Sequence, residues 1–124
     1  MHLLDTNAII YYIAGEPGVV TILDDLFKRE ETPCISTLTE LELFSSTKMT
    51  QNEETRIDTF LSLLRIIPLT SEIARIASDL RRLSPRLKTV DSAIAATALF
   101  ADATLVTRNV RDFEQVQGLE TLAI

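Results

Sequence analysis

The sequence predicts a single α/β domain in which a mostly parallel, five-stranded sheet lies between two layers of helices. Short apolar runs alternate with longer segments of helical pattern, and this order favours right-handed strand–helix–strand crossovers. The 124 residues are most simply one domain, spanning 1–124. A hydrophobic content of 46%, with three Gly and four Pro, is enough to form a core and is not typical of a disordered chain.

Turn residues separate the expected elements in the first half of the chain. Gly15 and Pro17 end the first helix, and Pro33 precedes the second strand. The helix that begins near Thr37 carries apolar residues at helical spacing, at Leu38, Leu41 and Phe44 or Ser45. The expected order is a strand at 2–4, helices over 7–14 and 18–29, a strand at 34–35, and helices from 37 and over 52–64.

The second half of the chain has clearer helical patterns. Segment 71–83, which Ser84 and Pro85 end, carries an amphipathic stripe formed by Ile73, Ile76, Ala77, Leu80 and Leu83. Segment 92–103 has only three polar residues, so we expect a buried helix there. The remaining strands are expected at 65–67, 104–107 and 122–124.

Charge is distributed unevenly along the chain. The net charge is −6, but residues 1–62 hold 11 acidic and 4 basic side chains, whereas residues 63–124 hold 7 acidic and 8 basic ones. A basic cluster in the second half is therefore either a surface that follows a phosphate backbone or a solvated helix face. Its members, the candidate phosphate contacts, are Arg81, Arg82, Arg86, Lys88, Arg108 and Arg111.

Three features favour a cytoplasmic protein without a membrane segment. No apolar run approaches the roughly 18 residues that indicate a membrane span. The first residues lack a basic segment followed by an apolar one, so no secretory signal is visible. Cys34 is the only cysteine and cannot form an internal disulfide, which fits a reducing compartment.

Several oxygen-bearing side chains follow the expected buried elements. Asp5 ends the first strand, Glu42 lies early in a helix after the second, Asp91 opens the buried helix, and Asn109 and Asp112 follow the fourth strand. The carboxyl ends of parallel strands form the ligand-binding edge of open α/β folds. Because hard divalent cations prefer carboxylate oxygens, this pattern indicates a metal site.

Each of these residues also has a local structural explanation. Asp5 could cap the following helix, Asp91 could complement a helix dipole, and Asn109 and Asp112 could serve a turn. Thr37 and Glu40 have the spacing of a capping box, which assigns Glu40 a structural role. Glu42 lies beyond the first turn, so capping does not explain it.

Four blocks of sequence, in order, resemble the PIN-domain nucleases, and especially the VapC-like toxins of toxin–antitoxin pairs. The blocks are LLDTNAIIYYI, ISTLTELELFSS, TVDSAIAATAL and LVTRNVRDFE, and the resemblance covers essentially the whole chain. The family's acidic positions correspond to Asp5, Glu42 and Asp91. The fourth position corresponds to Asn109, with Asp112 as a nearby alternative.

The resemblance implies a three-layer α/β/α PIN-like fold and a metal-dependent endoribonuclease that hydrolyses phosphodiester bonds in RNA. It implies Mg²⁺ or Mn²⁺ held by Asp5, Asp91 and Glu42, a cognate antitoxin protein, and a homodimer. The alternatives are a PIN-fold binding scaffold with weak catalysis and an RNA-maturation nuclease without an antitoxin. A phosphatase of the haloacid-dehalogenase type would need a D-x-D motif, whereas this chain has Asp5-Thr6-Asn7.

Overall fold

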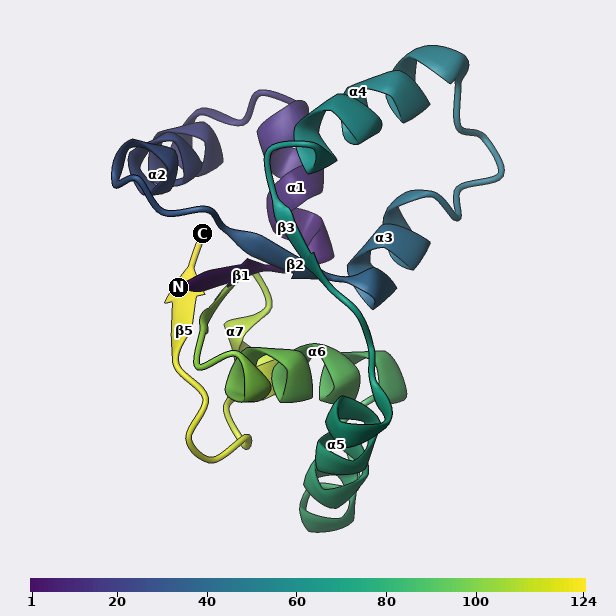
Figure 1. The fold of residues 1–124 in the computed structure, drawn as a ribbon, viewed down its shortest axis with the longest axis vertical. Coiled ribbons are helices and arrows are strands. Elements are labelled where there is room, and N and C mark those ends of the chain that lie inside the picture. Colours follow the sequence, from purple (N-terminus) through teal and green to yellow (C-terminus); the bar gives the residue numbers. More distant parts are fainter.

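A central sheet of five strands organises the protein, and in a computed structural model, which describes all of residues 1–124, every strand pair is parallel (Figure 1). The strand order is β3-β2-β1-β4-β5. The predicted five-stranded sheet is confirmed, and it is wholly parallel. The strands are β1 (His2–Leu4), β2 (Cys34–Ser36), β3 (Arg65–Ile67), β4 (Thr104–Thr107) and β5 (Thr121–Ala123).

Helices cover both faces of the sheet and complete the three predicted layers (Figure 1). One face packs against α1, α2 and α4, and the other packs against α6 and α7, with α5 packed on α6. None of the helices is long and apolar enough to cross a membrane. The helices are α1 (Thr6–Ile13), α2 (Pro17–Lys28), α3 (Thr37–Leu43), α4 (Gln51–Leu61), α5 (Ser71–Leu83), α6 (Thr89–Phe100) and α7 (Val110–Phe113).

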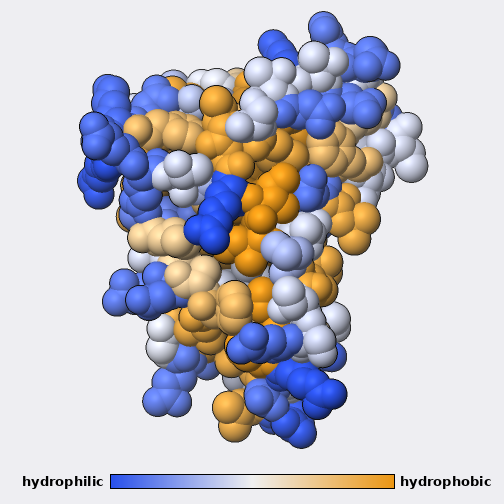
Figure 2. Space-filling model, in the orientation of Figure 1, coloured by the Kyte–Doolittle hydropathy of each residue, from blue (hydrophilic) through white to orange (hydrophobic).

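Alternation along the strands divides the core between the two faces. Leu4 and Val106 belong to the cluster with α1, α2 and α4, whereas their neighbours Leu3 and Leu105 belong to the cluster with α6 and α7. This is the two-residue period of a strand that is buried on both faces. Apolar residues accordingly lie across the middle of the molecule, while hydrophilic residues cover the outer helices (Figure 2).

Three local expectations are wrong. Leu41 is 63% exposed, because α3 turns Thr39 and Leu43 inward instead. Leu83, the last residue of α5, is 81% exposed. An apolar pattern identifies the inward face of a helix but does not show where the neighbouring surface ends. No helix was expected at residues 110–113, where Asn109 and Asp112 were considered as turn residues, but they form α7, which is too short to show a helical period.

Candidate functional site

The candidate site lies where β1 and β4 end side by side. The chain passes from β1 to β2 on one side of the sheet, whereas β4 lies on the other side of β1. The junction between β1 and β4 is therefore a topological switch point, at which open α/β sheets bind ligands. Pairing of Leu4 with Val106 brings the next residues, Asp5 and Thr107, together at the carboxyl edge.

Asp5 is buried at this junction and is held by several donors. Its Oδ1 accepts the Thr6 N–H at 2.8 Å, and its Oδ2 accepts the Thr107 hydroxyl at 2.8 Å and, more weakly, the Asn7 side-chain amide at 3.5 Å. Only 7% of Asp5 is exposed. Asp5 is also the N-cap of α1, so its capping role and its place in the site coexist.

The surroundings of Asp5 oppose its ionisation. Burial raises the pKa of Asp5 above its ordinary value, and the negative charge of Glu42 raises it further. Hydrogen bonds from Thr107, Thr6 and Asn7 act in the opposite direction without cancelling the rise. The fold therefore keeps a carboxylate where burial and a like charge both disfavour its ionised form.

Glu42 reaches the site through the first residue of α1. Its Oε1 accepts the Thr6 hydroxyl at 2.6 Å, and the Glu42 side chain is otherwise exposed. Thr6 therefore connects the two carboxylates, because its N–H binds Asp5 while its hydroxyl binds Glu42.

The predicted capping box of Thr37 and Glu40 is wrong. Ser36 is the N-cap of α3 and accepts the Leu38 N–H at 3.1 Å, whereas the Thr37 hydroxyl accepts the Leu69 N–H at 3.0 Å. The strand extends one residue further than predicted, so the cap moves to its last residue. Glu42, rather than Glu40, still makes the contact with the start of α1.

Asp91 completes the group from the first turn of α6. Burial raises the pKa of this half-buried carboxyl, and the charges of Asp5, Asp112 and Glu42 contribute to the rise. Lys88 opposes it. Carboxylates from four separate elements therefore act on one another at this edge of the sheet.

The two candidates for the fourth position lie differently. Asp112 shares a hollow of about 410 Å³ with Asp91. Asn109 is exposed at the start of α7, and its side chain makes no capping bond. Only its backbone enters the network, because the Asn109 N–H donates to the Thr107 hydroxyl oxygen at 3.1 Å.

The carboxylates do not form a ready-made metal cage. No three His, Cys, Asp or Glu side chains lie close enough together to hold one ion directly. Asp5, Asp91 and Glu42 are thus electrostatic neighbours but do not converge on a single point in this structure.

The six basic candidates separate into two groups. Arg86, Lys88 and Arg111 line the hollow that contains Asp91 and Asp112. The other three have protein partners. The Arg81 Nε donates to the Leu87 carbonyl at 3.0 Å, and Arg82 pairs with Asp79.

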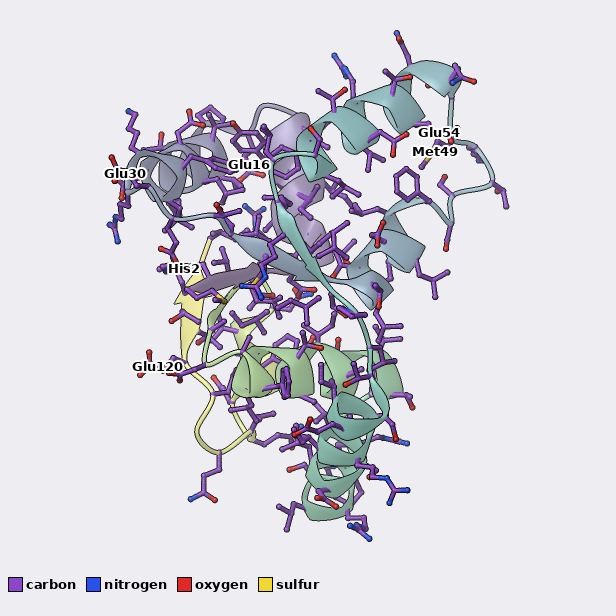
Figure 3. The ribbon with its side chains drawn as sticks, in the orientation of Figure 1. His2, Glu16, Glu30, Met49, Glu54 and Glu120 are labelled. Carbon is purple, nitrogen blue, oxygen red and sulfur yellow. The ribbon has the colours of Figure 1, made fainter.

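Arg108 is directed away from the other basic residues. It pairs with Glu16, and its guanidinium lies 4.0 Å from the centre of the Tyr11 ring. Glu16 lies at the turn between α1 and α2, on the side of the sheet opposite α5 and α6 (Figure 3). Arg108 therefore contributes to the packing around α1.

Thr107 is the site residue that the sequence did not reveal. Its fully buried hydroxyl donates to Asp5 and accepts from the Asn109 backbone, so it links the ends of β1 and β4. The two strands are about a hundred residues apart in sequence, and their adjacency is not visible in any local pattern. A threonine at the end of the fourth expected strand was the only available indication.

Comparisons with known proteins agree with the geometry. Residues 2–119 match the model of the PIN domain family. Ribonuclease VapC19 of Mycobacterium tuberculosis is 34% identical, over 97% of this chain and 98% of its own length. The tRNA(fMet)-specific endonuclease VapC of Shigella flexneri is 30% identical, over 96% of this chain and 94% of its own length.

Solved structures match over the same extent. VapBC2 from Rickettsia felis, bound to a DNA fragment from its promoter, superposes with a TM-score of 0.85 and 27% identity, covering 99% of this chain and 98% of that one. A toxin–antitoxin complex from Klebsiella pneumoniae gives a TM-score of 0.82 and 30% identity, with both chains covered completely. From its family match, its full-length relatives and its sheet topology, the chain belongs to the PIN-domain family.

Proposed function

We propose that this protein is a metal-dependent endoribonuclease that hydrolyses phosphodiester bonds in RNA and acts as the toxin of a toxin–antitoxin pair. The observation that carries the proposal is the buried Asp5, which is held by Thr107 and Thr6 among carboxylates from α3, α6 and α7. The full-length VapC relatives, which are named ribonucleases, support the same activity.

The donor set fits a hard divalent cation. Every side chain of the acidic group offers oxygen. Burial and then repulsion by its acidic neighbours raise the pKa of Asp91, and a bound cation would relieve that repulsion. Mg²⁺ usually keeps several waters and binds only one or two carboxylates directly, so a three-ligand cage is not required. We propose Mg²⁺ or Mn²⁺, held by Asp5, Asp91 and Glu42.

When bound, such an ion would lower the pKa of a nearby water and offset negative charge on the phosphate. The chain's own residues orient the acidic group. Thr107 and, more weakly, Asn7 donate to Asp5 Oδ2 and Thr6 donates to Oδ1, which leaves an acceptor position of Oδ1 for a ligand. Thr6 also fixes Glu42, so α1 positions two carboxylates through a single residue.

For the fourth position we propose Asp112, with Asn109 as the alternative. Asp112 shares the hollow with Asp91 and its charge acts on that carboxyl, whereas Asn109 enters the network through its backbone.

An antitoxin protein is the partner we propose besides RNA, because the structural neighbours include VapBC and toxin–antitoxin complexes. A second copy of the chain, forming a homodimer, is part of the same proposal.

The proposal is tested by expressing the chain alone and together with the small protein encoded beside it, and by incubating purified protein with total RNA. Growth arrest that the neighbouring protein relieves, with RNA cleavage that Asp5→Asn abolishes, is the expected result. Cleavage without a neighbouring antitoxin would instead support an RNA-maturation nuclease. RNA binding without cleavage would support a binding scaffold and overturn the enzymatic proposal.

A further inference from the structure

The hollow beside Asp91 combines acidic and basic side chains in a way that the acidic group alone does not explain. Arg86 and Lys88 come from the turn between α5 and α6, and Arg111 comes from α7. Helix α6 and strand β4 separate these segments in sequence, yet the fold brings their cations to one hollow of about 410 Å³, which Asp91, Asp112 and Glu114 also line.

The three cations of this hollow are free to bind a ligand. Arg86, Lys88 and Arg111 form no ion pair and no side-chain hydrogen bond, although carboxylates line the same hollow. By contrast, Arg82 and Arg108 are paired with Asp79 and Glu16. The structure therefore leaves unpaired positive charge beside the acidic group.

The three unpaired cations come from the α5–α6 turn and from α7, whereas α3 contributes none. Glu42, the other exposed carboxylate of the site, belongs to α3, which carries Glu40 and Glu42 but no lysine or arginine. No residue of α3 lines the hollow. A polyanion that passes the carboxylates is therefore repelled along α3 and attracted toward the cations of the α5–α6 turn and α7.

We propose that Arg86, Lys88 and Arg111 bind backbone phosphates of the RNA next to the bond that is cleaved, so that the bound strand extends from the carboxylates over the α5–α6 turn and α7 and not over α3. This inference rests on the proposed function. Phosphate contacts position a strand without specifying its sequence, so the hollow sets the direction of the RNA rather than its base preference.

The salt dependence of binding measures these contacts. The probe is fluorescein-labelled oligouridine, and Asp5→Asn serves as the background in every protein so that the probe stays intact. The test variant carries Arg86→Gln, Lys88→Gln and Arg111→Gln. The control carries Lys48→Gln, Arg65→Gln and Arg75→Gln, which are exposed, unpaired and outside the hollow, so both variants lose three positive charges.

Single-stranded nucleic acid loses about 0.7 in the slope of log affinity against log salt for each phosphate contact removed. We expect the test variant to flatten the slope by about 2, and the control to keep the slope of its background. Equal slopes in all three proteins, or equal flattening in both variants, would overturn the inference.

Oligouridines that carry an abasic scissile site and are extended on only one side test the direction. Extension toward one end should raise the affinity of the background protein, and this gain should disappear in the test variant but not in the control. Equal gains from both extensions would contradict a one-sided path. RNA cleavage by the wild-type protein, measured first, tests the proposed function separately, so either can fail without the other.

Discussion

Asp5 and Asp91 belong to the same acidic group, but the fold holds them in different ways. Asp5 is buried and accepts hydrogen bonds from Thr6, Thr107 and Asn7, on the shared edge of β1 and β4. Asp91 is half-buried at the start of α6, and its side chain accepts no hydrogen bond. The exposed side chain of Asp112 on α7 accepts none either.

The difference separates a fixed half of the site from an open half. Strand register positions Asp5, because Leu4 pairs with Val106 and the next residues follow. On the α6–α7 half, the oxygens of Asp91 and Asp112 keep all their acceptor positions and lie beside free cations. We infer that the β1–β4 half is preorganised and that the α6–α7 half adapts to the ligand.

Removing the charge of the fixed half should have the largest effect. Asp5→Asn should abolish cleavage in a single-turnover assay with labelled RNA. It should also leave the metal-free protein at least as stable as the wild type, because it removes a charge that burial and Glu42 both disfavour. Loss of cleavage together with a large fall in the melting temperature would mean that Asp5 is needed for folding.

The pH dependence gives this prediction a sign. The pKa of Asp5 is raised in the folded protein, so the folded state binds its proton more tightly than the unfolded chain does. Ionised Asp5 therefore destabilises the metal-free fold above its folded-state pKa, and this effect is lost as the pH falls below the ordinary value of 3.8. The stability gain of Asp5→Asn should be full near neutral pH and shrink on acidification.

Glu42 and Glu40 offer a matched pair on α3. Residues two positions apart on an α-helix differ by about 200° in direction, so Glu40 and Glu42 cannot both face one site. Glu42→Gln should remove most metal-dependent cleavage, because the substitution removes the negative charge. It should change stability little, because the Gln oxygen can still accept the Thr6 hydroxyl as the Glu42 carboxylate does. Glu40→Gln should keep cleavage. If the single-turnover rates show the reverse, the placement of the second acidic residue is wrong.

Thr107 and Thr39 are both fully buried, but only the hydroxyl of Thr107 has hydrogen-bond partners. Thr107→Val should lower cleavage about 10- to 100-fold, as expected when a residue that orients a metal ligand is lost. It should also weaken Mn²⁺ binding in calorimetry, and Thr107→Ser should restore both.

Thr39→Val is the control, because it removes a buried hydroxyl that has no partner. It should be neutral or should raise the free energy of unfolding by about 1 kcal/mol, without changing cleavage. Equal effects of the two substitutions on Mn²⁺ binding would show that Thr107 acts only through packing.

The open half should give the smallest effects. Asp112→Asn should lower the cleavage rate several-fold and Asn109→Ala less, because the charge of Asp112 acts on Asp91 while Asn109 contributes its backbone N–H. A larger loss for Asn109→Ala than for Asp112→Asn, in the same assay, would assign the fourth position to Asn109.

Local patterns predicted most of the fold. The bounds of β1, β3, β4 and α5 agree with the predicted ones, since each element ends at a turn residue or an abrupt change of polarity. Periodicity could not place Leu41 or Leu83, because burial depends on which neighbouring surface is present. The cap of α3 was displaced by the one-residue extension of β2 to Ser36.

The acidic group was predictable to a similar degree. Residues that follow strands or open helices stand out in the sequence, and Asp5, Glu42, Asp91 and Asp112 prove to be electrostatic neighbours. Thr107 was not predictable, since its role depends on β4 lying beside β1. Nor could the sequence show which basic residues have protein partners and which line the hollow, because ion pairs such as that of Arg108 with Glu16 join distant segments.

Metal dependence is the most direct test of the central claim, that the acidic group forms a cation site for RNA hydrolysis. Purified wild-type protein should cleave a susceptible RNA when Mg²⁺ or Mn²⁺ is present, stop in excess EDTA, and resume when the cation is restored. Asp5→Asn should show no cleavage under any of these conditions, which excludes a contaminating nuclease. Undiminished cleavage by the wild-type protein in EDTA would contradict the account.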